Sequence, residues 1–308
     1  MLTRHSVDTS LRFDRLAELP ERRDIEVTGE PPAPDRPPAQ ERIREPYLAS
    51  AELEDAVNVA IALGRPLLLQ GDPGAGKTRL AHAVSYALGL PLEEAYIKST
   101  SRGQDLLYVY DAVRRLYDTQ LGRGLPADEG SYVRLGPLGR AIVRAGHGRR
   151  SMVLIDEIDK ADIDFPNDLL RELDQLAFDV PEVPGVRHAV PADRPDLRPV
   201  IVVTNNEEKA LPAAFLRRCV FHHVRFPDSV AELDAILALH GIGDVELRTE
   251  AIETLLRLRA LDLAKKPGLS ELLDWVSYLQ AIGVRPDGGV PFAGVLIKQH
   301  ADALRLER

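Results

Sequence analysis

Residues 71–78 read Gly-Asp-Pro-Gly-Ala-Gly-Lys-Thr and directly follow the apolar run Leu67-Leu68-Leu69. This stretch decides the fold, because it predicts a buried strand, a glycine-rich turn and a helix that opens at Lys77. Glycines let the backbone turn tightly, so that its N–H groups can face phosphate oxygens. The helix N-terminus adds partial positive charge. The stretch therefore predicts a binding site for a nucleoside triphosphate.

Two side chains in this stretch carry specific expectations. The ammonium group of Lys77 is expected to reach the β and γ phosphates, and the hydroxyl of Thr78 is expected to ligate Mg²⁺. The predicted contacts to the nucleotide come from nine consecutive residues: Gly71, Asp72, Pro73, Gly74, Ala75, Gly76, Lys77, Thr78 and Arg79.

A second stretch, residues 151–157, is an apolar run that ends in Asp156 and Glu157. A parallel strand buried on both faces has this continuous pattern, and ligands gather at the carboxyl ends of such strands. Asp156 is predicted to hold Mg²⁺ and Glu157 to orient and polarise the attacking water. By itself, such a run also fits a helix cap or a solvated strand end. The phosphate loop upstream favours the catalytic interpretation.

The composition bounds the class of protein. The 308-residue chain is 44% hydrophobic and 28% charged, which is ordinary for a globular protein with room for two domains. The formal net charge of -9 argues against broad binding to DNA or RNA, whose affinity comes mainly from lysine and arginine on phosphate. The single cysteine, Cys219, excludes an intramolecular disulfide and fits a reducing cytosol.

The sequence contains no apolar run of membrane-span length. Residues 1–10 carry charges and lack an apolar core, so they are not expected to form a signal peptide. We therefore expect a cytoplasmic protein without a membrane span.

Three parts follow one another along the chain. Residues 1–45 are expected to be a disordered, proline-rich tail, because residues 31–38 form an extended linker. The mildly amphipathic stretch 11–16 allows an alternative, a short docking segment. Residues 46–227 are predicted to be an α/β nucleotide-binding domain, and residues 228–308 a helical lid.

Strands alternate with helices in the middle part, which predicts a doubly wound parallel sheet covered on both faces. The predicted strands are 66–70, 95–97, 152–155, 200–203 and 221–224. The predicted helices there are 50–63, 78–88, 108–121, 136–145 and 165–176, with an irregular hairpin over 178–195. The last part is predicted to be purely helical, over 231–239, 249–261, 270–282 and 292–306.

Polar residues follow the fourth predicted strand, where Asn205 and Asn206 end the run Val203-Thr204. An amide at this position can hold the attacking water near the γ phosphate, although an Asn turn that closes the strand is an alternative. Further on, Arg217 and Arg218 stand at a predicted helix end. Two interpretations of these arginines are open. They are surface cations favoured by the helix dipole, or they form an arginine finger that stabilises charge on the γ phosphate of a neighbouring subunit.

Taken together, these residues resemble the MoxR-like branch of the AAA+ ATPases, over about residues 46–290. The Walker A motif of that family matches 71–78 and its Walker B motif matches 153–159. Gly136-Pro137-Leu138 precedes Walker B, as the family's Gly-Pro-Leu does. Residues 211–218 resemble its finger segment. The long separation of the two Walker motifs suits the helix-2 insertion of this branch, and residues 178–198 match an insertion before sensor 1.

The resemblance implies roles for individual residues. Asn206 matches sensor 1, with Asn205 as the close alternative. Arg218 matches the arginine finger better than Arg217, which replaces an acidic residue usual in the family. The basic sensor-2 residue of the family is missing from Gly268-Leu269-Ser270-Glu271. Lys265 and Lys266 lie just upstream as possible substitutes.

The resemblance further implies a ring of identical subunits, by family a hexamer, that hydrolyses Mg-ATP and remodels a protein partner. Partners of such proteins often carry a von Willebrand A domain. Two other classes stay open. One is the motor subunit of a nucleic-acid-processing or restriction-type complex, and the other is a non-hydrolysing nucleotide switch, against which Glu157 argues.

Overall fold

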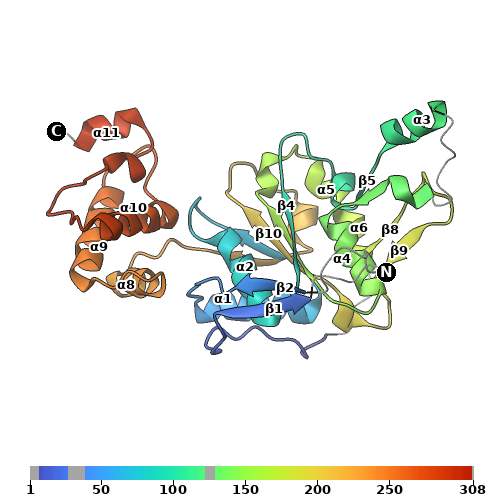
Figure 1. Cartoon of the computed structure of the whole chain (residues 1–308), viewed down its shortest axis with the longest axis horizontal. Helices are drawn as coiled ribbons and strands as arrows, with labels where there is room; N and C mark the ends of the chain where they lie inside the picture. The colour runs from blue at the N-terminus through green and yellow to red at the C-terminus, as the bar shows by residue number, and fades with distance from the viewer. Residues whose placement is uncertain (1–6, 27–38, 122–128, 307–308) are drawn as a thin grey trace. The chain divides into compact units, whose positions relative to one another are not determined.

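The computed structural model describes residues 7–26, 39–121 and 129–306, and Figure 1 traces their helices and strands. The chain divides into two compact units. The first consists of residues 1–45, 50–70 and 81–222, and the second of residues 46–49, 71–80 and 223–308. The predicted domain boundaries at residues 45 and 227 stay a prediction.

A five-stranded sheet is the centre of the first unit, in the order β11-β3-β10-β7-β4. Strand β10 pairs parallel with both β3 and β7, and β4 pairs parallel with β7. The doubly wound α/β fold expected from the sequence is therefore confirmed. The strands are β3 (Leu67–Gln70), β4 (Leu92–Tyr96), β7 (Met152–Asp156), β10 (Val200–Asn205) and β11 (Val220–His223).

The middle strands of this sheet are buried along their whole length. Every residue of β7 and of β10 is buried, as their continuous apolar runs predict for strands covered on both faces. The side chains on one face, Val153 and Ile155 of β7 with Ile201 and Val203 of β10, join a hydrophobic core in which Leu138 and Phe215 are fully covered. This core holds the carboxyl ends of the strands in a fixed arrangement.

Helices flank the sheet (Figure 1). Helix α1 (Ala51–Leu63) begins after Ser50, whose side chain accepts a hydrogen bond from Leu53, and ends at the left-handed Gly64, as predicted. Helix α1 packs on β3, and α4 (Pro137–Gly146) packs on β4 and β7. Helix α2 spans Lys77–Leu88.

Two predicted helices of the first unit differ from the structure. The range 108–121 contains strand β5 (Tyr108–Tyr110), which pairs antiparallel with β6 (Val133–Leu135), and only then helix α3 (Ala112–Gln120). The Asp111 side chain caps α3 and so separates the two elements. The range 165–176 is divided into α5 (Phe165–Asp168) and α6 (Leu170–Gln175).

The irregular hairpin expected over 178–195 is present. Strands β8 (Ala177–Asp179) and β9 (Arg187–Ala189) pair antiparallel. The ring of Phe178 faces His188 across this pair, with ring centroids 5.1 Å apart.

The N-terminal part of the chain differs from the disordered tail expected for residues 1–45. Strands β1 (Arg22–Glu26) and β2 (Ala39–Ile43) pair antiparallel, and Phe13 and Ile25 are buried. The backbone of Phe13 forms two hydrogen bonds with the Asn58 side chain on α1. These contacts agree with the alternative interpretation, a docking segment. The proline-rich linker 31–38 lies outside the described residues.

The second unit contains the C-terminal helices. They are α8 (Val230–Leu239), α9 (Val245–Ala260), α10 (Leu269–Ile282) and α11 (His300–Leu306). The range 292–306, predicted as one helix, holds the short 3-10 helix η5 (Ala293–Val295) before α11. A separate hydrophobic core surrounds Trp275, whose indole N–H donates to the carbonyl of Pro291 at 2.7 Å. Among the residues that the structure describes, no helix is long and apolar enough to cross a membrane.

Candidate nucleotide-binding site

The glycine-rich loop leaves β3 at Gln70 and turns through three glycines of positive φ. Gly71, Gly74 and Gly76 have φ values of 148°, 78° and 88°, a region that side chains other than glycine rarely adopt. A Cβ atom on Gly71 would lie 2.3 Å from the carbonyl oxygen of Val224. The loop therefore needs glycine at this position for both conformation and space.

Lys77 opens α2, as the sequence predicts. Its side chain is buried, and its ammonium group donates hydrogen bonds to the carbonyl oxygens of Gly71 (2.6 Å) and Asp72 (2.8 Å). The ammonium group therefore lies inside the curve of the loop, bound to the loop's own backbone.

The other predicted loop residues differ in exposure. Asp72, Pro73 and Arg79 are exposed, Thr78 is partly buried, and Ala75 is buried. The loop also has a neighbour that the sequence did not indicate. A Cβ on Gly76 would lie 3.4 Å from the ring of Tyr47, which therefore packs directly on the loop. Burial raises the pKa of the Tyr47 hydroxyl above its ordinary value, and Glu232 adds to this effect.

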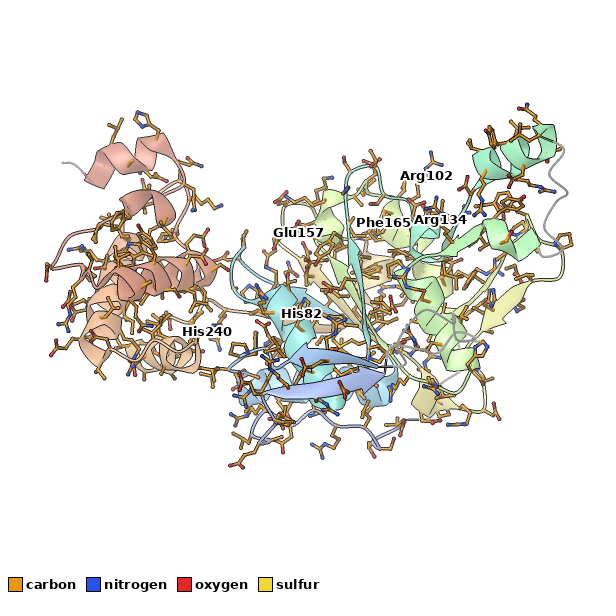
Figure 2. All side chains as sticks on the ribbon, in the orientation of Figure 1. His82, Arg102, Arg134, Glu157, Phe165 and His240 are labelled. Atoms are coloured by element: carbon orange, nitrogen blue, oxygen red, sulfur yellow. The ribbon has the colours of Figure 1, made fainter. Side chains whose placement is uncertain are left out.

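Asp156 and Glu157 stand at the carboxyl end of β7, and one hydroxyl joins them. Thr204 Oγ1 donates to Asp156 Oδ1 at 2.6 Å and accepts from the backbone N–H of Glu157 at 2.8 Å. Glu157, labelled in Figure 2, has a left-handed backbone with φ 58°. A residue other than glycine pays roughly 1–3 kcal/mol for such a conformation, so the Thr204 contact helps to fix it.

The two asparagines after β10 have different partners. Asn206 Nδ2 donates to Glu157 Oε1 at 2.9 Å. Asn205 is buried, and its side-chain oxygen accepts from the backbone N–H of Glu207 at 2.7 Å, two residues on. The structure thus brings Asn206 to Glu157, while Asn205 closes the turn in the way that the alternative interpretation describes.

Asp159 is a site residue that the sequence analysis missed. Its side chain is buried, and Oδ2 accepts the backbone N–H groups of Asn206 (3.2 Å) and Glu208 (3.0 Å). It therefore anchors the loop that carries Asn206. Position 159 lay within the Walker B match, so the signal was present, but nothing in the sequence paired it with residues 206–208.

Arg217 and Arg218 follow helix α7 (Ala213–Leu216) and lie in different environments. Arg218 is partly buried; its Nε donates to Asp174 Oδ2 at 2.8 Å and its Nη1 to the carbonyl of Ala214 at 2.9 Å. Arg217 is exposed. Arg218 is therefore held by its own subunit in this structure.

Whether the upstream lysines replace the missing basic residue at the start of α10 stays a prediction. The side chains of Lys265 and Lys266 are exposed, and the backbone of Lys265 is bound by Asp302. A different cation, Arg259 on α9, has its pKa lowered by burial, and the carboxylate of Asp72 in the glycine-rich loop acts against this lowering. Nothing in the sequence singles out Arg259 among the arginines of this helix.

The chemistry available at this edge of the sheet follows from its groups. Strands β3 and β7 flank β10, so parallel pairing brings Gln70, Asp156 and Asn205 to the same edge, where ligands of such sheets bind. The groups are the carboxylate of Glu157, which accepts from Asn206, the hydroxyl-bound carboxylate of Asp156 and the amide of Asn206. In the described residues, no cluster of three or more His, Cys, Asp or Glu side chains forms a metal site.

The comparison with known proteins agrees with this arrangement. Residues 66–219 match the model of one family, described as the AAA domain of the dynein-related subfamily. The match runs from the residue before β3 to the residue after Arg218, and so includes both candidate motifs. No curated protein matches the sequence.

Proposed function

The chain belongs to the family of AAA domains of the dynein-related subfamily, and from this membership we propose that it is a MoxR-like motor that hydrolyses ATP. AAA domains bind nucleotides, but family membership alone leaves open whether a member hydrolyses them. The observation that carries the proposal is the group around Glu157. A general base needs a fixed position and a carboxylate near the reacting water.

Three residues supply that position. Thr204 fixes the Glu157 backbone and Asn206 contacts its carboxylate, while Asp159 anchors the Asn206 loop. We assign Glu157 the role of polarising the attacking water and Asn206 the role of orienting it. A non-hydrolysing switch would have no need of this arrangement, so it supports turnover.

The nucleotide itself is assigned to the loop Gly71–Arg79. Its backbone N–H groups would hold the phosphates, and Lys77 would exchange its two carbonyl partners for the β and γ phosphates. The hydroxyl of Thr78 and the carboxylate of Asp156 are hard oxygen donors, which suits Mg²⁺. When bound, Mg²⁺ neutralises charge on the phosphates.

Arg218 and Arg217 are the candidates for the arginine finger that acts on a neighbouring subunit. Such a finger requires an oligomer, and the MoxR resemblance favours a hexameric ring. The same resemblance supports a chaperone-like remodeller of a protein partner, one partner class being proteins with a von Willebrand A domain. The single cysteine fits a cytoplasmic location. Net charge speaks against nucleic acid as that partner.

The test of this proposal is ATP turnover by purified wild type, Lys77→Ala and Glu157→Gln proteins. Lys77→Ala should abolish ATP binding. Glu157→Gln should bind ATP with wild-type affinity and turn it over on the order of 10²-fold or more slowly. Wild-type turnover by Glu157→Gln would contradict the assignment. Repeating the assay with DNA and RNA distinguishes the alternative motor, because only that class should be stimulated.

A further inference from the structure

The start of helix α10 lies directly against the glycine-rich loop. The N–H of Leu269 donates to the carbonyl of Gly74 at 3.3 Å. A Cβ added to either Gly74 or Gly268 would lie 3.4 Å from the Cα of the other glycine. The two backbones therefore touch without intervening side chains, and a movement of Gly74 must displace Gly268, or else break this hydrogen bond.

Arg259, in the last turn of α9, holds the segment that makes this contact. Its Nη1 donates to the carbonyl of Pro267 at 2.7 Å, one residue before Gly268. Its guanidinium lies over the ring of Phe226, with Cζ 3.4 Å from the ring centroid. Phe226 belongs to the segment between β11 and α8. Arg259 thus contacts two connecting segments of the second unit, the one before α8 and the one before α10. The segment before α10 leads into the contact with the glycine-rich loop.

Charge relates Arg259 to the loop itself. Burial lowers the pKa of the Arg259 guanidinium, and the carboxylates of Asp72 and Asp228 raise it again. Asp72 directly follows Gly71 in the loop. A partly desolvated cation interacts more strongly with nearby anions than an exposed one does, so Arg259 responds to a change of charge at the loop. The exposed side chains of Lys265 and Lys266 lack this environment.

We propose that Arg259 is a positioning residue that couples the phosphate-binding loop to the helical part of the chain, through Pro267 and the contact of Leu269 with Gly74. This inference rests on the proposed function, because it assumes that a nucleotide binds at the loop. It adds the residue and the contact through which binding reaches helices α8, α9 and α10.

The mechanism follows from the contacts. Phosphates held by the loop place negative charge next to Asp72, and the loop backbone rearranges around them. Arg259 is attracted toward the added negative charge and, through its bond to Pro267, keeps Gly268 and Leu269 against Gly74. Without Arg259 the loop would still bind phosphate, but the segment 262–270 would no longer follow it.

Hydrogen–deuterium exchange tests this separation, with Mg²⁺ and a non-hydrolysable ATP analogue as the probe. Two peptides are compared, one covering residues 71–80 and one covering 262–270. In the wild-type protein, the analogue should slow exchange in both peptides, by about threefold or more. In Arg259→Ala, the peptide 71–80 should keep its slowing, and the response of peptide 262–270 should be lost.

Arg257→Ala is the matched control. Arg257 lies two residues away on the same helix and donates to the carbonyl of Gly288, away from Pro267. Its removal should leave both responses at the wild-type level. Arg259→Lys keeps the positive charge but lacks the planar guanidinium that stacks and donates at once, so it should give a partial response in peptide 262–270.

Each outcome decides between the two proposals. A wild-type response of peptide 262–270 in Arg259→Ala overturns the coupling and leaves nucleotide binding intact. Failure of both wild-type peptides to respond overturns the proposed function and the coupling with it. Fluorescence of Trp275, the single tryptophan and fully buried, reports whether each variant keeps its helical core. If Arg259→Ala loses that core, Arg259→Lys takes its place. A full wild-type response of peptide 262–270 in Arg259→Lys would then overturn the coupling.

Discussion

The side-chain amide of Asn206 donates a 2.9 Å hydrogen bond to the carboxylate of Glu157. The two residues lie 49 positions apart in sequence and follow β10 and β7, which are neighbours in the sheet. In the proposed reaction, the same amide and carboxylate must instead share a water molecule. The contact therefore belongs to a resting arrangement, in which Asn206 binds Glu157 directly. During the proposed reaction, Asn206 would instead orient the water that Glu157 polarises.

Asn206→Ala should slow ATP turnover by roughly 10²-fold, because the water loses its orienting amide, and should leave ATP affinity nearly unchanged. Asn205→Ala should act on stability, by about 1 kcal/mol, since the amide of Asn205 closes a turn. Steady-state turnover and thermal unfolding of both variants separate the two roles. If only Asn205→Ala lost turnover, Asn205 would be the residue that orients the water, and Asn206 would have the structural role.

Thr204→Val removes the hydroxyl that bridges Asp156 and Glu157 while keeping the shape of the side chain. The buried Asp156 carboxylate then loses the Thr204 hydroxyl as a donor, so we expect a loss of stability of about 1–3 kcal/mol. Turnover should fall roughly 10- to 100-fold, as for other residues that position a catalytic group. Thr249→Val, on a helix surface of the second unit, is the matched control. Equal turnover in the two variants would show that the bridge has no catalytic role.

Arg218→Ala should leave ATP affinity nearly unchanged and slow turnover by roughly 10²-fold or more, the behaviour of an arginine finger. Arg217→Ala should have a smaller effect. Because Arg218 is paired with Asp174 of its own chain, the finger role requires that this partly exposed pair open, which costs about 1 kcal/mol.

Mixing Arg218→Ala with Glu157→Gln subunits tests the action between subunits. Some interfaces then pair an intact finger with an intact Glu157, so part of the activity should return. A mixture that stays inactive, together with complete loss in Arg217→Ala alone, would move the finger to Arg217. Full turnover in both single variants would leave the two residues as ordinary surface cations.

His188 should make stability fall in mild acid. Burial lowers the pKa of His188 from its ordinary value of 6.5, and the neighbouring His147 lowers it further. The unfolded chain therefore takes up the proton first, so the contribution is fully present above pH 6.5 and is lost as pH falls through the lower folded pKa. Thermal unfolding between pH 7.5 and about 5 should show a smaller decline for His188→Gln.

His300→Gln, at the exposed start of α11, is the matched control for the acid effect. It removes one histidine from a different environment and should retain the wild-type decline. An unchanged decline in His188→Gln would show that other groups cause the acid sensitivity.

The fold was predictable where short-range rules determine it. The run 67–69 and the loop 71–78 predicted a strand, a turn and a helix. Ser50 and Gly64 marked the two ends of α1, as capping rules require. The division at Asp111 was missed because Val113, Leu116 and Tyr117 continue a helical spacing. The helical pattern is real, but these side chains are exposed on α3, so periodicity carried no information about where the helix begins.

Site residues were predictable where a motif alone identifies them. They were not predictable where their role depends on a contact with a residue that is distant in sequence. Lys77, Asp156 and Glu157 follow from motif spacing. The choice between Asn205 and Asn206 depends on which amide meets Glu157, and a one-residue difference in a strand reverses the face. Arg259 was not predictable, because its role depends on contacts with Phe226 and Pro267 that only the tertiary structure creates.

The N-terminal segment packs on α1 and α2 and is therefore part of the folding unit. Pro20 and Arg23 are bound to Tyr86 on α2, and Phe13 is bound to Asn58 on α1. A chain shortened to begin at residue 46 would keep every candidate site residue. It would also uncover the surface beneath Phe13 and Ile25, whose burial contributes roughly 1.5–3 kcal/mol each. Such a shortened chain would be prone to self-association through that surface, and the aggregate would be mistaken for ring assembly.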